Sequence, residues 1–286
     1  MKLLISLIGL VATFTSCATS IELYHVPSKQ SYSLEKGVAK LPAEGFIILG
    51  ETHYDKETQV AQGLFIEAMV SHLQIEGNFS VGWEFLNYPD QLLLDEKFNQ
   101  YSEGSLSFDD LLKSFFGKKP GGHLLYRPIF DAAKKFSGKV VATNAPREWK
   151  SKIVSGGLGA LESQYIPRNM ERGSTFYFQR FLAAMGSHAP ADKIENYFLA
   201  QSYSDAVMAK SLVDQSAGQL TFMIVGNFHS DFGHGLPSYL RKVTNENVLQ
   251  LRMINLKGLS AEERLTALAD DALYGPRSSW LLILNK

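Results

Sequence analysis

The chain of 286 residues contains a single cysteine, Cys17. Because no other thiol is present, disulfide bonds, thiolate catalysis and cysteine-ligated metals are excluded from the rest of the protein. An excess of charge of one sign is also lacking, since 28 Lys and Arg face 29 Asp and Glu, for a net charge of −1. This balance provides no general attraction to polyanions, so we expect no nucleic-acid binding.

Long apolar runs are absent after the N-terminus, so no later segment is expected to span a membrane. The start of the chain combines Lys2, an apolar stretch over 3–14 and two small residues before Cys17, which is typical of a secretory signal. A cysteine at this point resembles the lipobox of bacterial lipoproteins. We therefore expect a signal peptide over 1–17, lipidation of Cys17 and a membrane-anchored cell-envelope protein, with the outer membrane, facing the periplasm or the surface, as its location. The alternative is an ordinary signal peptide with an incidental cysteine.

One pattern occurs twice in the remaining chain: an apolar run followed by Gly-x-x-His. Phe46–Leu49 leads into Gly50–His53, and Phe222–Val225 leads into Gly226–His229. Such runs closed by glycine are typical of buried strands in an α/β sheet. Ligands of α/β proteins bind outside the carboxyl ends of the strands. The pattern therefore predicts two imidazoles at one functional edge of a sheet.

The order of the predicted elements indicates an α/β fold, a mostly parallel sheet flanked by helices. We expect one α/β domain over 41–286, preceded by a polar tether over 18–40, and a helical insertion over about 149–217. The predicted strands are 46–49, 79–85, 139–143, 220–225, 247–254 and 280–284. The predicted helices outside the insertion are 56–74, 89–116 with a break at 101–105, and 128–136.

Polar residues at the predicted strand ends are the candidates for a site. They are Glu51, His53, Glu84, Asn144, Arg147, His229, Asp231 and His234. Histidine and carboxylate suit a zinc, iron or manganese site, but they equally suit a metal-free pair in which a glutamate orients a histidine base. The spacing leaves both open. On a predicted helix over 192–214, Asp205 either faces solvent or points into the crevice to pair with Arg147 or a histidine.

Several motifs in order carry a family resemblance. They are Gly50-Glu51-Thr52-His53, Trp83-Glu84-Phe85, Asn144-Ala145-Pro146-Arg147, the segment Ala200–Ala209, Gly226-Asn227-Phe228-His229 and Gly233-His234-Gly235-Leu236-Pro237. Together they resemble the ChaN family of haem-binding lipoproteins, which is similar to the wider Tiki, TraB and erythromycin-esterase group. The lipobox-like N-terminus agrees with this resemblance.

The resemblance implies haem as cofactor, a role in haem or iron uptake, and haem held between two subunits of a homodimer with tyrosine bound to the iron. Tyr126 is the first candidate for this ligand, with Arg127 beside it to pair with a propionate. The alternative for Tyr126 is an ordinary aromatic residue at the edge of the core. Tyr54 is the second candidate ligand. The other residues of the predicted haem site are Arg147, Asp205 and His234.

The wider group implies a second function, a hydrolase assisted by a divalent metal ion. The paired motifs of Tiki-like peptidases would correspond to His53, Glu84 and His229, and erythromycin esterase-like members use a histidine as base. In that case we expect Glu84 or His53 as the base and His229 as a metal ligand or transition-state stabiliser, with Glu51 completing the catalytic set.

Overall fold

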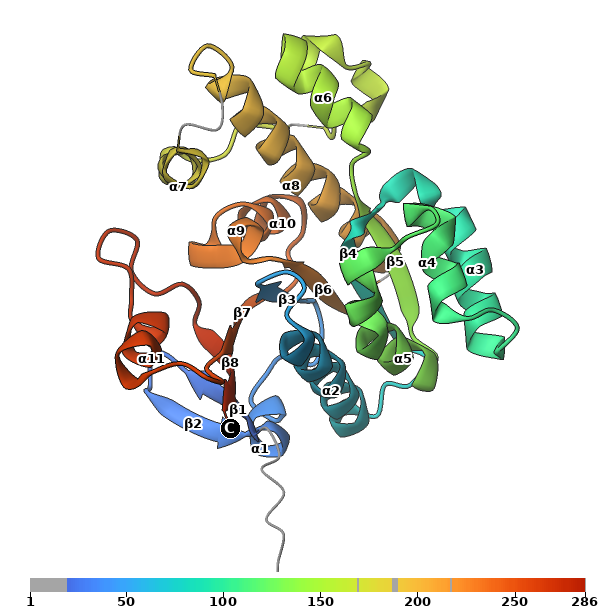
Figure 1. The fold of residues 1–286 in the computed structure, drawn as a ribbon, viewed down its shortest axis with the longest axis vertical. Coiled ribbons are helices and arrows are strands. Elements are labelled where there is room, and N and C mark those ends of the chain that lie inside the picture. Colours follow the sequence, from blue (N-terminus) through green and yellow to red (C-terminus); the bar gives the residue numbers. More distant parts are fainter. Residues whose placement is uncertain (1–19, 169, 187–189, 217, 286) are drawn as a thin grey trace, which may run out of the picture.

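A computed structural model describes residues 20–168, 170–186, 190–216 and 218–285 (Figure 1). The predicted signal peptide and the lipidation site Cys17 lie outside these residues. Within them, no helix has both the length and the apolar character of a membrane span.

One eight-stranded sheet forms the centre of the fold, in the order β2-β1-β8-β7-β3-β6-β4-β5. The six strands from β8 to β5 run parallel, and β1 pairs antiparallel with both β8 and β2. The strands are β1 Ser20–His25, β2 Gln30–Ser33, β3 Phe46–Glu51, β4 Phe79–Asn87, β5 Lys139–Asn144, β6 Leu220–Gly226, β7 Val248–Asn255 and β8 Trp280–Asn285. The predicted α/β fold with a mostly parallel sheet is confirmed.

Helices cover both faces of the sheet because alternate strand residues point to opposite sides. Ile47 and Leu49 join the core cluster on one face, and Phe46 and Ile48 join the cluster on the other. The first face is covered by α1 Leu34–Val38, α2 Lys56–Leu73, α3 Gln91–Glu103, α4 Phe108–Phe116 and α5 Arg127–Lys135. The second is covered by α8 Ile194–Ser216 and α10 Leu236–Val243, with α11 Ala261–Leu268 packed near the β7–β8 edge.

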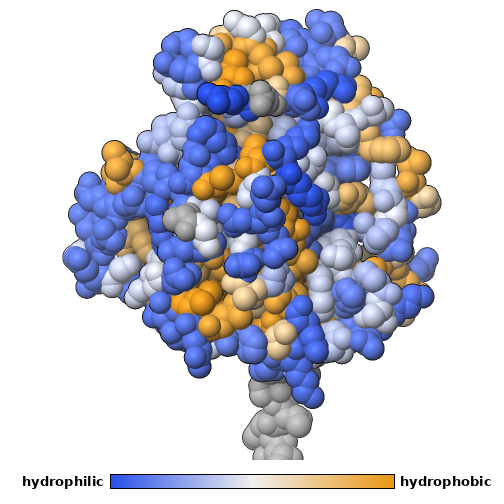
Figure 2. Space-filling view, turned by 180° about the vertical axis from the view of Figure 1, so that it is seen from behind, coloured by the Kyte–Doolittle hydropathy of each residue, from blue (hydrophilic) through white to orange (hydrophobic). Residues whose placement is uncertain are grey.

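The predicted helical insertion also exists. It contains most of α6 Arg147–Gly156 and all of α7 Thr175–Met185 and α8, with two short 3₁₀ turns at Leu158–Ala160 and Ser163–Tyr165. In Figure 1, α6 and α7 lie in the upper part of the molecule, and α8 runs from there down to the sheet. The rear view in Figure 2 shows mainly polar side chains with separate apolar patches, one of them among these upper helices.

The prediction of a polar tether over 18–40 is wrong for the part that the structure describes. Residues Ser20–His25 and Gln30–Ser33 form the two outer strands of the sheet, and Leu23 is fully buried. The partner of β1 is β8, at the opposite end of the chain, with Leu23 opposite Leu282. A short strand whose inner neighbour in the sheet is so distant in sequence carries little local signal.

Candidate functional site

The two Gly-x-x-His motifs lie side by side, because β3 and β6 are parallel neighbours with Glu51 opposite Gly226. Their glycines make room for each other's loops. A Cβ on Gly50 would stand 2.1 Å from the Ser230 hydroxyl, and a Cβ on Gly226 would stand 2.6 Å from Nε2 of His53. Each glycine is therefore required by the loop that follows the neighbouring strand.

His53 lies between two carboxylates. Its Nδ1 is 3.0 Å from Oε1 of Glu51, and its Nε2 is 2.8 Å from Oε1 of Glu84. Burial by itself lowers the pKa of His53, but hydrogen bonds to both carboxylates and their charges together raise it to about 10. Both ring nitrogens therefore donate, and His53 is an imidazolium at neutral pH. Glu51 also accepts from Gln59 Nε2 at 2.9 Å and from the hydroxyl of Tyr126.

His229 belongs to the second motif, on the single turn α9 Asn227–Ser230. Its Nδ1 donates to Oδ1 of Asp205 at 2.6 Å, and the hydroxyl of Tyr177 donates to Oδ2 of the same carboxylate at 2.9 Å. Burial lowers the pKa of His229, but the charge of Asp205 and this hydrogen bond outweigh it, so that the pKa is raised. Burial also raises the pKa of Asp205, against the charge of His229.

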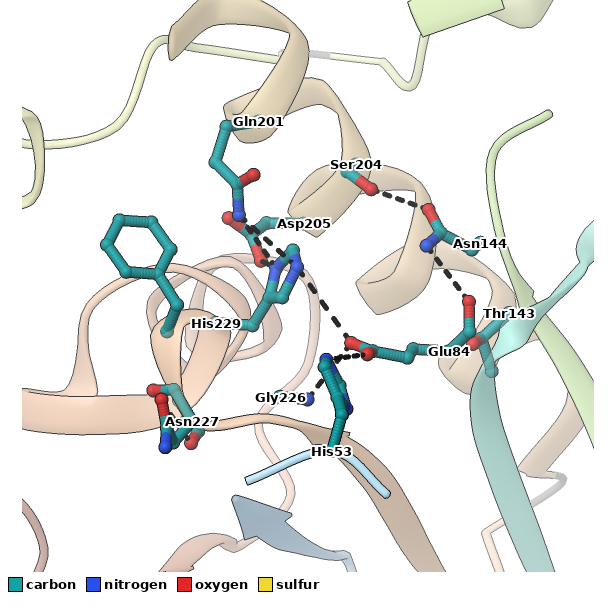
Figure 3. A network of polar contacts seen from close by, with 12 residues as sticks. His53, Glu84, Thr143, Asn144, Gln201, Ser204, Asp205, Gly226, Asn227 and His229 are labelled. Atoms are coloured by element: carbon teal, nitrogen blue, oxygen red, sulfur yellow. Dashed lines mark hydrogen bonds and ion pairs between the residues drawn. The ribbon is translucent and has the colours of Figure 1, made fainter. Parts of the chain in front are cut away.

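Glu84 joins the two motifs (Figure 3). Oε1 accepts from His53, while Oε2 accepts from the backbone N–H of Gly226 at 3.0 Å and lies 3.8 Å from Nε2 of His229. Burial raises the pKa of Glu84, but the hydrogen bond from His53 and the charges of both imidazoles hold it below its usual range. The result is one chain of contacts with a tyrosine at each end: Tyr126, Glu51, His53, Glu84, His229, Asp205 and Tyr177.

The predicted metal ligands His53, Glu84 and His229 are brought together, but they contact one another rather than surround a common point. Both nitrogens of His53 are engaged by carboxylates. Among the described residues, no group of three or more His, Cys, Asp or Glu side chains is arranged to hold a metal ion. The arrangement therefore gives the predicted three-residue metal site no support.

A cleft opens above Glu84 and His229, between α6 and α8. Its volume is about 810 Å³, within the range of small-molecule sites. Three cations line it, namely Arg147, Lys150 and Lys193, together with an apolar wall of Phe85, Val154, Phe181, Met185, Tyr197 and Ala200. Burial lowers the pKa of Lys150, partly offset by the charge of Glu84. The cleft thus combines apolar surface with positive charge.

The two candidate tyrosines have opposite environments. Tyr126 is fully buried and its hydroxyl donates to Glu51, whereas Tyr54 is 44% exposed. In this structure Tyr126 is packed as a core aromatic residue, the arrangement that its alternative to iron ligation predicts. Tyr54 packs against the rings of Phe85 and His53, with centroid distances of 5.6 and 5.9 Å, and its hydroxyl is 3.3 Å from Nε2 of His123.

The backbone of Tyr54 has φ +62°, a left-handed conformation that is costly for an aromatic residue. A Cβ on Gly122 would stand 2.5 Å from the Tyr54 ring, so this glycine allows the ring to pack closely against the turn at 121–126. The conformation directs the phenol to the rim of the site, where it is open to solvent.

The remaining predicted residues are divided between the site and other regions. Arg147 lines the cleft, and Asp205 lies in the network, with a histidine rather than Arg147 as its partner. Arg127 is exposed and lies 3.7 Å from the carboxylate of Asp131 on its own helix. His234 is half-buried against Arg180 behind the second motif, where burial and Arg180 lower its pKa to about 4.

The sequence interpretation missed four residues of the site, Gln59, Lys150, Tyr177 and Lys193. Lys150 follows Arg147 by three positions on α6, so the two share a helix face, and this spacing was a usable signal. Tyr177 comes from α7, and nothing in its local sequence indicates that it reaches Asp205.

Comparison with known proteins identifies the family and supports the fold. The model of the family described as "Haem-binding uptake, Tiki superfamily, ChaN" matches residues 37–240. A structure described as cofacial haem binding to ChaN of Campylobacter jejuni has a TM-score of 0.71 and 17% identity, covering 93% of this chain and 98% of that chain. No curated protein matches the sequence significantly.

Two other solved structures are more distant. The type III effector HopBA1 has a TM-score of 0.46 and 12% identity over 88% of this chain and 91% of that one. A mutant of the erythromycin esterase EreC in its open conformation has a TM-score of 0.38 and 10% identity over 85% and 76%. The family match extends over both Gly-x-x-His motifs and Glu84, the residues that form the network. This chain belongs to the ChaN family of the Tiki superfamily.

Proposed function

We propose that this protein binds haem in the region between Tyr54 and the cleft, and that it takes part in haem or iron uptake. Family membership supports this function, and the Campylobacter relative is described as binding haem cofacially. The observation that carries the proposal for this chain is the exposed phenol of Tyr54 beside an apolar, cationic cleft.

The residues around Tyr54 fit an iron ligand of the tyrosinate type. Burial and the negative charges of Glu84 and Glu51 raise the pKa of Tyr54, so the phenol keeps its proton when no cation is near. The same negative charges favour a cation at this point, and ferric haem supplies one. His123 holds the hydroxyl from the side through its Nε2.

The cleft fits the porphyrin ring and the carboxylates of haem. Haem is flat and apolar with two carboxylates at one edge. Phe85 lies in contact with Tyr54 and also lines the cleft, so apolar surface is continuous from the phenol to the interior. Arg147 and Lys150 lie along the same cleft, and cations of this kind pair with carboxylates.

The experiment is a hemin titration of the chain without residues 1–17. We expect saturable binding by the wild type and at least about tenfold weaker binding by Tyr54→Phe. Tyr24→Phe, on strand β1 and outside the site, is the matched control and should bind as the wild type does. Absence of saturable hemin binding by the wild type would contradict the proposal.

A second function, hydrolysis, is favoured by one observation. Nε2 of His229 lies at the cleft, while Asp205 orients the ring through Nδ1, as in a base oriented by a carboxylate. This arrangement needs no metal. With p-nitrophenyl butyrate as probe, we expect turnover that rises with pH as His229 loses its proton and falls about 100-fold or more in His229→Gln. Equal rates in the two proteins would refute this activity.

The proposal includes an anchored, dimeric protein. Its support is the lipobox-like sequence at Cys17 and the family resemblance, which implies a homodimer around haem. Mass spectrometry of the chain purified from bacterial membranes should show a diacylated Cys17, and Cys17→Ser should release the protein from the outer membrane fraction. Sedimentation of the soluble chain with and without hemin should show a dimer in the presence of hemin.

A further inference from the structure

The first strand of the sheet begins close to the expected lipidation site. β1 starts at Ser20, three positions after Cys17, and it is fixed in the sheet on both sides by pairing with β8 and β2. Ser20 lies opposite Asn285 of β8, and Leu23 is fully buried. Only residues 18 and 19 therefore separate Cys17 from the folded domain.

The reach of this link is small compared with the size of the domain. Three residue steps span at most about 10 Å when the chain is fully extended. A domain of this length has a radius of gyration of about 18 Å, so that it is about 45 Å across. A lipid anchor at Cys17 can therefore hold only the end of the domain where β1 begins against a membrane.

The start of the chain's fold and the cleft lie at opposite ends of the molecule. α1 packs against β1, since a Cβ on Gly37 would stand 2.5 Å from the Leu23 side chain. In Figure 1, where the longest axis is vertical, β1, β2 and α1 lie in the lower part, whereas α6 and α7 lie in the upper part. The cleft is lined by Arg147 and Lys150 of α6 and by Phe181 of α7, so it belongs to the upper part.

The exposed surface of α1 has little net charge. This helix and the two residues after it carry exposed Glu35, Lys36 and Lys40. A single excess positive charge attracts an anionic bilayer only weakly. Contact of this surface with lipid therefore depends on the anchor and the short link rather than on the surface itself.

We propose that the anchor at Cys17 holds the end of the domain formed by β1 and α1 against the lipid headgroups, and that the end formed by α6 and α7, with the cleft, extends into the aqueous phase. The partner of the β1–α1 surface is the bilayer that carries the anchor. The inference rests on the proposed function, because it requires a diacylated Cys17. A ligand of the cleft then enters and leaves from the aqueous side.

Fluorescence quenching in vesicles tests this orientation. The chain has no cysteine besides Cys17, whose thiol is consumed by the lipid, so one introduced cysteine accepts a thiol-reactive fluorophore at a single place. Lys36→Cys on α1 and Lys152→Cys on α6 are a matched pair, since both lysines are exposed on helices. With phosphatidylcholine that carries a spin label on its headgroup, we expect a loss of fluorescence in Lys36→Cys and none in Lys152→Cys. Lys40→Cys should behave as Lys36→Cys does.

A longer link tests why the β1–α1 end meets the membrane. About 30 Gly and Ser residues inserted between Cys17 and Ser20 would span about 30 Å, and the quenching in Lys36→Cys should then fall to the level in Lys152→Cys. Equal quenching at the two positions, or stronger quenching at position 152, would overturn the inference. Quenching in Lys36→Cys that survives the insertion would also overturn it, because the surface itself would then bind lipid.

Mass spectrometry of the same protein, purified from bacterial membranes, separates this inference from the proposed function. A Cys17 without acyl chains would overturn the anchor and the orientation together. A diacylated protein with equal quenching at both positions would overturn the orientation alone. Hemin binding by the soluble chain is measured independently of both results.

Discussion

The site has two halves, each formed by one Gly-x-x-His motif and the carboxylates that its histidine contacts. The two halves differ in how their histidine nitrogens are bonded. In the first half, His53 is 36% exposed, yet both of its nitrogens are taken by carboxylates. In the second half, His229 is only 15% exposed, its Nδ1 is bonded to Asp205, and its Nε2 lies 3.3 Å from Nε2 of Gln201 and 3.8 Å from Glu84. The more exposed histidine, His53, is therefore the one with carboxylates at hydrogen-bond distance from both ring nitrogens.

This difference assigns different roles to the halves. His53 is a fixed imidazolium that holds Glu51 and Glu84 in place, and the accessible group beside it is the phenol of Tyr54. His229 lines the cleft and is oriented by Asp205, and no carboxylate oxygen of the described residues lies closer than 3.8 Å to its Nε2. We therefore expect iron chemistry beside the first half and proton and anion chemistry beside the second.

Loss of the Glu84 carboxylate, which both halves share, should have the largest effect on the free energy of unfolding. Glu84→Gln removes the buried charge that both imidazoles face, and breaking such a buried pair costs about 3–5 kcal/mol. We expect the free energy of unfolding, measured with urea, to fall by this amount. Glu148→Gln, an exposed position on α6, serves as control and should change it little. A loss below about 1 kcal/mol in Glu84→Gln would mean that the halves are independent.

The glycines should show that each half makes room for the other. Gly50→Ala places a methyl group against the Ser230 hydroxyl, and Gly226→Ala places one against His53. Each should destabilise the protein by about 1–3 kcal/mol. Ser230→Ala removes the clashing oxygen, so it should partly restore Gly50→Ala but not Gly226→Ala. Equal restoration of both would contradict this account.

Substitution of the tyrosines at the two ends of the network should lower the stability of the protein by smaller and similar amounts. Tyr126→Phe and Tyr177→Phe each remove one hydrogen bond to a buried carboxylate, at a cost of about 1–2 kcal/mol. Thermal unfolding measures both. A much larger loss in one of them would show that the two ends of the network are not equivalent.

The pH dependence of stability should be the smallest effect, because solvent reaches His53 and screens its charges. The pKa of His53 is about 10 in the folded protein and about 6.5 in the unfolded chain. A raised pKa contributes stability that is complete below pH 6.5 and is lost as the pH rises towards 10. The decrease over this range should be smaller in His53→Gln than in the wild type, whereas exposed His72→Gln should keep the full decrease.

The sequence predicted the central strands and the meeting of the two motifs, since buried apolar runs closed by glycine carry a strong local signal. It did not predict β1, whose partner is at the other end of the chain. From the sequence, Tyr126 was preferred over Tyr54 as the candidate iron ligand. The sequence could not show that Tyr126 is buried, because its burial is set by tertiary packing against Phe85 and Trp83. The cleft cation Lys150 was missed although its spacing from Arg147 places both residues on one face of α6.

The absorption spectrum of the ferric haem complex distinguishes the two tyrosines as iron ligands. We expect a charge-transfer band typical of tyrosinate in the wild type and in Tyr126→Phe, and loss of this band in Tyr54→Phe. A band that persists in Tyr54→Phe and disappears in Tyr126→Phe would contradict the assignment of the iron to the exposed tyrosine.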